Sequence, residues 1–213
     1  MSNPDSFIEE VTQEVRRDRL FALFRRYGWI GILLVVALVG GAAYNEWRKA
    51  GDTAQAQAFG NALGAALQSA DPVAALTAVQ PPPDGAALKV LLLAGEQAGA
   101  GEEDSARATL SALAQDMGVP EVYRHLASLK QVLLMDGTPP QDRRALLAPL
   151  ARPGAPFRLL AEEQLALIDI ETGDAGAART RLEALAQDAE ATAGLRQRAA
   201  QLMLALGQAP DAR

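Results

Sequence analysis

The hydrophobic positions of this chain follow two patterns, which change near residue 46. Residues 27–45 form a run of nineteen without a single charged side chain, between Arg26 and Glu46. As a helix this run would span about 28 Å, close to the ~30 Å hydrocarbon thickness of a bilayer. Beyond it, apolar residues recur at helical spacing among polar ones. We therefore predict a single transmembrane helix at 27–45, followed by a helical soluble part.

Aromatic residues support this placement of the membrane helix. Two stand at each end of the apolar run: Tyr27, Trp29, Tyr44 and Trp47. Amphipathic rings of this kind gather at the two lipid–water interfaces. A buried core helix and a cleaved signal peptide are the alternatives. The charged region before the apolar run is 26 residues long, which exceeds the usual length in a signal peptide and favours an uncleaved anchor.

Positive charge predicts the orientation of the anchor. Five arginines lie close before the span, and only Arg48 and Lys49 follow it closely. By the positive-inside rule the N-terminus stays in the cytoplasm, and the soluble part lies in the periplasm if the source is Gram-negative. Residues 1–26 carry apolar residues at helical spacing, acidic residues first and basic residues last. We expect a cytoplasmic amphipathic helix lying on the lipid bilayer, or else a docking element for a cytoplasmic partner.

The soluble part divides at its prolines. Residues 46–84 predict a connector and a first helical pair, broken at Asp71-Pro72 and ended by the three prolines at 81–83. Residues 85–213 predict a packed array of helical pairs. The expected pairs are 86–98 with 103–116, 120–135 with 141–151 and 156–172 with 175–189, followed by a helix at 193–207 that caps the open end.

The array is predicted from internal repetition. Residues 106–116 match residues 178–188 at eight of eleven positions, an offset of two 36-residue periods. A degenerate middle copy follows from the similar spacing of Leu110, Leu147 and Leu182. The chain thus resembles tetratricopeptide repeats, whose period is about 34 residues. The small residues of that motif match Ala94 with Ala106, and Ala166 with Ala178, whereas the middle copy has Gln131 and Arg143 there. The fold class implied is an all-α tetratricopeptide-like solenoid.

Composition removes most enzymatic chemistry. Aromatics are 5% of the chain, cysteine is absent and His125 is the single histidine, so thiol nucleophiles, disulfides and Cys/His zinc sites are excluded. The adjacent carboxylates Glu162 and Glu163 are interpreted as a solvated helix face. The net charge of −6 argues against a nucleic-acid partner. We expect a non-enzymatic protein with no catalytic or metal-binding residue, no cofactor and no small-molecule substrate.

Protein binding is the function that remains. The inner helices of a curved repeat array line a groove suited to peptides or to a segment of a partner. The residues predicted to face such a groove are Tyr123, Arg124, Lys130 and Arg158. Ordinary surface positions are the alternative interpretation of these four.

The whole layout resembles one family, most strongly over residues 5–50. Its short acidic-then-basic N-terminal helix, single span and small repeat domain are similar to the YfgM-like proteins, ancillary subunits of the SecYEG translocon. The resemblance implies an inner-membrane adaptor that helps to hand translocated proteins to a membrane-anchored periplasmic chaperone. The alternative is an anchored repeat scaffold for an envelope-assembly complex, such as one of cell division or cytochrome maturation.

Overall fold

A computed structural model describes the backbone of residues 4–207 and the side chains of residues 29–31 and 33–207. All regular secondary structure in this described part is helical, which confirms the all-α prediction. The predicted amphipathic character of residues 1–26 depends on side chains outside the described residues. Residues 208–213, the last six of the predicted 85–213 domain, also lie outside the described residues.

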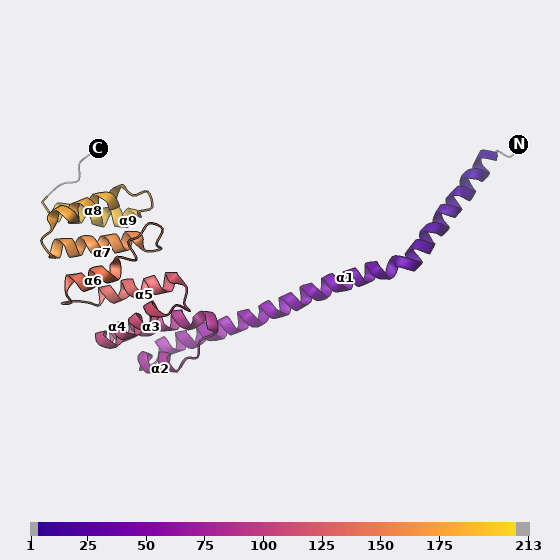
Figure 1. Ribbon diagram of the computed structural model, residues 1–213. Coiled ribbons are helices and arrows are strands. Elements are labelled where there is room, and N and C mark those ends of the chain that lie inside the picture. Colours follow the sequence, from indigo (N-terminus) through magenta and orange to yellow (C-terminus); the bar gives the residue numbers. More distant parts are fainter. Residues whose placement is uncertain (1–3, 208–213) are drawn as a thin grey trace. The chain divides into compact units, whose positions relative to one another are not determined.

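The first helix, α1, runs from Pro4 to Leu67 and includes both the expected membrane span and the expected connector (Figure 1). Its Trp29–Leu67 part is, among the described residues, the one helix long and apolar enough to cross a membrane. Between Leu33 and Val39 the large apolar side chains on every side of the helix are more than half exposed, including Leu34 at 56% and Leu38 at 66%. A helix that is apolar all round needs a lipid or protein environment.

The chain divides into two compact units, of which the first ends at Ala58 and the second begins at Phe59. The second unit holds the last residues of α1, the short 3-10 helix η1 and eight further α-helices. Their bounds are α2 Pro72–Ala78, η1 Pro83–Gly85, α3 Ala86–Gly99, α4 Glu103–Gln115, α5 Glu121–Leu133, α6 Pro140–Leu147, α7 Arg158–Glu171, α8 Ala175–Gln187 and α9 Ala193–Ala205. The largest departure from the expected ranges is α6, which ends four residues before the predicted 151.

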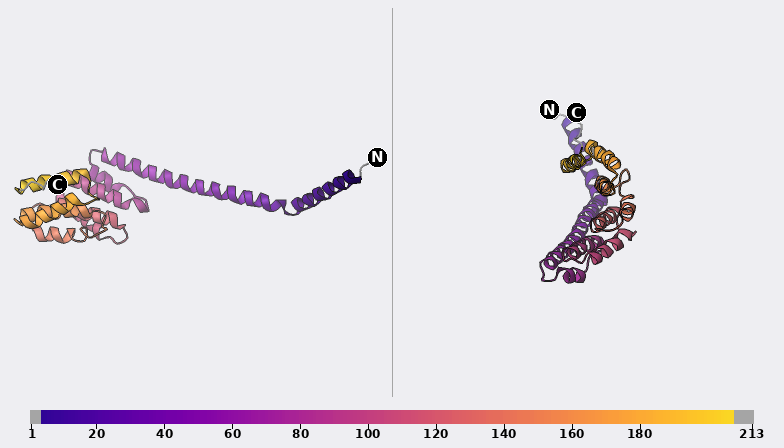
Figure 2. Two further views of the ribbon diagram at one scale, coloured as in Figure 1. Left: turned by 90° about the horizontal axis from the view of Figure 1, so that it is seen from above. Right: turned by 90° about the vertical axis from the view of Figure 1, so that its left-hand side faces the viewer.

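Within the second unit the helices follow one another in space in chain order (Figures 1 and 2). Each helix from α2 to α9 packs against its successor. Four clusters of buried apolar side chains lie between them. The first cluster joins Leu63 and Ala66 of α1 to Leu76 of α2, so the end of α1 belongs to the packed unit.

Local signals in the sequence explain where helices begin and turn. The Asp71 carboxylate accepts a hydrogen bond from the Ala74 backbone N–H and so caps α2, directly before Pro72. At Gly85 the ring of Phe59 approaches so closely that an added Cβ would lie 2.6 Å from it, which leaves no room for a side chain.

Three turns between helices each contain a glycine with a positive φ, and the first and third also share a backbone hydrogen bond. Gly101, Gly137 and Gly173 have φ angles of 80°, 72° and 80°, a region that favours glycine, and they lie 36 residues apart. In the first turn the Glu102 N–H donates to the Gln97 carbonyl at 2.8 Å, and in the third the Asp174 N–H donates to the Asp169 carbonyl at 2.8 Å. The internal similarity of the sequence therefore has a geometric counterpart at the same offset.

Candidate binding surface

Two helices of the second unit each carry a stripe with two leucines seven residues apart. On α5 the stripe consists of Leu126, Lys130 and Leu133; on α7 it consists of Leu160, Gln164 and Leu167. Seven residues are close to two helical turns, so the two leucines of each stripe lie on one side of their helix. Leu133 is 55% exposed and Leu160 and Leu167 are 38% exposed each, whereas Leu126 is partly buried.

The residue before each exposed leucine at the C-terminal end of a stripe is buried. Val132 on α5 and Ala166 on α7 are 6% and 0% exposed. Leu129 and Val132 of α5 share a core cluster with Ala161 and other residues of α7, which places the two helices against common packing. Leu133, Leu160 and Leu167 thus belong to the large apolar side chains that the second unit leaves exposed, together with Leu88, Met117, Val122 and Leu204. We call these six residues the leucine stripes.

Of the four residues predicted for a groove, Lys130 lies within a leucine stripe and is exposed. Tyr123 is half-buried and packs against the cluster formed by α3 and α4. Arg124 points its Nη1 toward the sulfur of Met117, at 3.0 Å, in the loop that precedes α5. The α5 residues among the four therefore face in different directions.

Arg158, the fourth, is engaged by the end of α8. Its Nη2 donates to a carboxylate oxygen of Asp188 and to one of Glu190, both at 2.8 Å. The hydrogen bond that Arg158 donates to Glu190, followed by the one it donates to Asp188, raises the pKa of Arg158. The Arg158 guanidinium, together with the Glu190 backbone N–H, lowers the pKa of Asp188. This arginine binds its own chain, across 30 residues of sequence.

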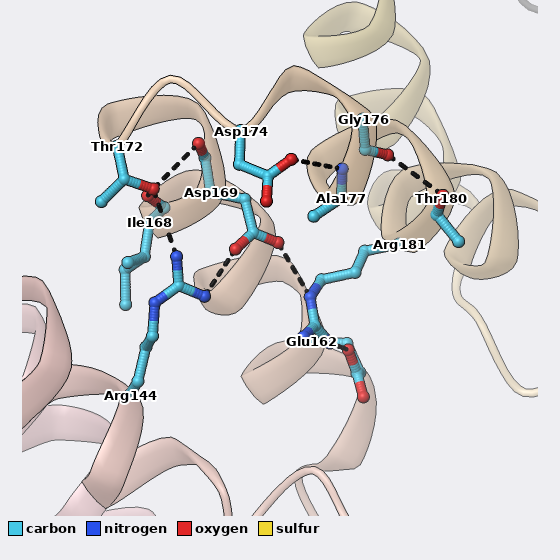
Figure 3. Close-up of polar contacts among 10 residues, drawn as sticks. All are labelled: Arg144, Glu162, Ile168, Asp169, Thr172, Asp174, Gly176, Ala177, Thr180 and Arg181. Atoms are coloured by element: carbon cyan, nitrogen blue, oxygen red, sulfur yellow. Dashed lines mark hydrogen bonds and ion pairs between the residues drawn. The ribbon is translucent and has the colours of Figure 1, made fainter.

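A buried carboxylate near the end of α7 joins three helices (Figure 3). Asp169 of α7, 2% exposed, accepts from Arg144 Nη1 of α6 at 2.5 Å and from Arg181 Nε of α8 at 2.9 Å. Arg181 also donates to Glu162 at 2.5 Å. Burial opposes the charge of Arg181, but the bonds to Glu162 and Asp169 prevail and raise its pKa. The network holds α6, α7 and α8 in fixed relation.

The solvated interpretation of Glu162 and Glu163 is wrong for the second residue. Glu163 is 6% exposed, and Arg198 of α9 binds it through two parallel bonds of 2.6 and 2.8 Å. These bonds raise the pKa of Arg198. A carboxylate can be buried here because a bidentate arginine from 35 residues away compensates its charge.

Two cavities open on the second unit. One, of about 240 Å³, lies between α7 and α8, and its charged walls are Arg158, Glu162, Arg181 and Asp188, which pair with one another. The other, of about 640 Å³, lies between the start of α2 and the turn after α3, with Asp71, Glu96 and Glu102 in its wall. Among the described residues no group of three or more His, Asp or Glu side chains is arranged to hold a metal ion.

His125 lies on α5, 13% exposed, with its Nε2 3.2 Å from Glu121 one turn earlier. This contact is local to one helix and brings in no group from another element.

The leucine stripes were not predicted from the sequence, whose predicted groove residues are charged or aromatic. The signal was present as two leucine pairs of spacing seven, Leu126 with Leu133 and Leu160 with Leu167, which are 34 residues apart. Sequence alone could not separate them from core leucines such as Leu129 and Leu165, which are buried on the same helices.

Comparison with models of protein families, with curated proteins and with solved structures gives no match to this chain.

Proposed function

We propose that this chain is a non-enzymatic, membrane-anchored adaptor that binds apolar segments of other polypeptides through its leucine stripes. The observation that carries the proposal is the exposure of Leu133, Leu160 and Leu167 beside a well-packed core. Apolar side chains on neighbouring helices bind partners without a fixed charge pattern, which suits weak and varied clients.

We interpret the second unit as a tetratricopeptide-like repeat array, an architecture that suits this function. Glycines with a positive φ at Gly101, Gly137 and Gly173, 36 residues apart, suit a solenoid of helical pairs. In this interpretation α9 is the capping helix. Its exposed residues include the polar Gln197 and Gln201 and the small Ala205, beside one large apolar side chain, Leu204.

The charges of the second unit favour an apolar client over a partner recognised by fixed charges. Five arginines that a charged partner could contact already bind carboxylates of their own chain: Arg143, Arg144, Arg158, Arg181 and Arg198. A scaffold that selects one folded partner by charge complementarity would leave such groups available. The envelope-assembly alternative is therefore the weaker one.

The anchor gives the proposed location. The apolar part of α1 crosses the inner membrane once, with the N-terminus in the cytoplasm and the second unit in the periplasm, as the arginines before the span imply. Tyr44 and Trp47 pair on one side of the helix, with ring centroids 6.2 Å apart, at the level expected for a lipid–water interface. The resemblance to YfgM-like proteins suggests SecYEG and a membrane-anchored periplasmic chaperone as the partners.

Site-specific photocrosslinking in native membranes tests the client-binding surface. A photoreactive residue at Leu133 or Leu167 is expected to capture newly translocated chains, translocon subunits and a chaperone. A probe at the exposed Glu183 of α8 is the matched control and should capture far fewer. Capture of one folded envelope complex from both positions would contradict the proposal and support the scaffold.

A substitution in the stripes tests the same surface from the other side. The double variant L133S/L167S should lower client capture several-fold while the protein keeps its stability, because both side chains are substantially exposed. Unchanged capture by this variant, with capture lost instead in a Lys130→Ala variant, would show that charge rather than the leucines carries the binding.

A further inference from the structure

The second unit holds two helices with interchangeable apolar faces. The buried apolar face of α4 consists of Ala106, Leu110 and Leu113. That of α8 has the same residues 72 positions later, Ala178, Leu182 and Leu185. Their partners α3 and α7 present a buried alanine at the crossing, Ala94 and Ala166. Shape alone therefore permits α8 to dock on α3, and α4 on α7, within a folding chain or between two chains.

The polar contact beside each crossing differs where the apolar contact does not. In the first pair Thr109 donates to the Gln97 side chain at 2.9 Å, a bond between neutral groups. In the third pair the equivalent residues, again 72 positions on, are Arg181 and Asp169, which form an ion pair at 2.9 Å. Arg181 also binds Glu162, whose equivalent in α3 is the apolar Val90.

The middle pair, α5 with α6, differs from both at the equivalent positions, 36 residues after Gln97 and Thr109. These are Leu133, which is 55% exposed, and Ala145. Neither side chain can make the hydrogen bond of the first pair or the ion pair of the third.

Exchange of partners would leave charges without compensation. With α8 on α3, the Arg181 guanidinium would face Val90 and the neutral Gln97. With α4 on α7, Thr109 would replace the arginine, and Asp169, 2% exposed, would keep only Arg144. Removing one partner of a buried ion pair is strongly unfavourable, and the native pairing avoids this in both places.

We infer that two sets of side chains act as a pairing code, which means that they determine which helices pack together. The first set is Val90, Gln97 and Thr109 in the first pair, and the second is Glu162, Asp169 and Arg181 in the third pair. This code prevents near-identical helices from exchanging partners and thereby from linking two chains by domain swapping. Buried polar groups that select one register or partner at some expense in stability have this effect in other helical proteins. The inference is independent of the proposed function.

Three variants of the full chain test the code. The first, V90E/Q97D/T109R, gives both pairs the charged contact, and the second, E162V/D169Q/R181T, gives both the neutral one. The third combines all six substitutions and exchanges the code between the pairs. The second variant only removes charges, so it keeps the test available if added carboxylates prevent the first from folding.

Co-refolding measures the exchange directly. Chains with two different affinity tags are unfolded together, refolded in detergent micelles and captured by one tag, and the other tag is then quantified. A sample mixed after refolding corrects for association through α1. We expect each of the first two variants to raise the corrected co-capture by about tenfold over the unsubstituted chain, and the six-substitution variant to return to its level.

Two results would overturn the inference. Co-capture at the unsubstituted level in both duplicated-code variants, with helical content retained by circular dichroism, would show that these contacts do not select partners. Co-capture in the six-substitution variant as high as in the duplicated ones would show that lost stability, and not lost distinction between pairs, causes the exchange.

Discussion

The two halves of the second unit have the same kind of helices but different chemistry between them. In the half that ends with α5, the ion pair of Arg107 with Asp104 and the contact of His125 with Glu121 join residues three or four positions apart. In the half from α6 to α9, every ion pair among the described residues links separate elements, over 12 to 32 positions for those of Arg158 and Arg181. Apolar packing builds the first half, and arginines tie the second together.

The difference follows from what each half can bury. The first half has few carboxylates facing its interior, and its core clusters are made of leucine and alanine. In the second half α7 directs Glu163 and Asp169 inward, and each then requires an arginine from another helix. Similar repeats can thus be stabilised by area alone or by area together with fixed charge pairs.

The largest expected effect is one that both halves share. Leu110→Ala and Leu182→Ala remove equivalent leucines, 1% and 0% exposed, and each should lower the free energy of unfolding by about 3 kcal/mol. Denaturant unfolding followed by circular dichroism measures this. A difference of more than about 1.5 kcal/mol between the two variants would show that the ion pairs compensate for a lost core contact.

The two halves should lose different amounts of stability when the polar side-chain contact between their paired helices is removed. Arg181→Met leaves Glu162 without a partner and Asp169 with Arg144 alone, and should cost about 2–3 kcal/mol, reduced because Arg181 is one third exposed. Thr109→Val, the matched change, should cost about 1 kcal/mol. The same unfolding measurement checks both, and equal losses would break the comparison between the halves.

A third pair of variants tests the backbone rather than the side chains. Gly101→Ala and Gly173→Ala place a Cβ at a φ of 80°, and each should cost about 1 kcal/mol. Hydrogen exchange at the following helices, α4 and α8, locates the effect. Protection lost at α8 alone would indicate that the turn in the charged half bears additional strain.

The smallest expected effect is the loss of stability at acidic pH through Asp188. The pKa of Asp188 is lowered in the folded protein, so its pair with Arg158 stabilises at neutral pH and that contribution disappears as the pH falls from about 4 through the lowered value. The stability difference between the unsubstituted chain and Asp188→Asn should therefore shrink in acid. A difference that stays constant from pH 7 to about pH 3 would contradict the proposed pairing.

Much of the fold could be predicted because its boundaries are set locally. Prolines and glycines fix the ends of most helices, and Asp71 and Asp174 cap two of them. The predicted end of α6 at residue 151 was wrong, since Pro149 lacks the N–H that a continuing helix would donate. The helix therefore ends before this proline although the apolar pattern continues past it.

The surface could be predicted less well because it depends on contacts distant in sequence. Whether Arg158 faces solvent or an acid is decided by Asp188 and Glu190, 30 and 32 residues later. Lys130, by contrast, is exposed on α5. The burial of Glu163 likewise depends on Arg198, which periodicity cannot pair with it.

The alternation of exposed and buried positions at the leucine stripes has an evolutionary consequence. Leu133 and Leu167 each follow a residue that the core cannot lose, Val132 and Ala166. The exposed residue can mutate with little effect on folding, while its neighbour holds the helix in place. Selection could therefore retune which polypeptides this surface accepts, one side chain at a time, without passing through unstable intermediates.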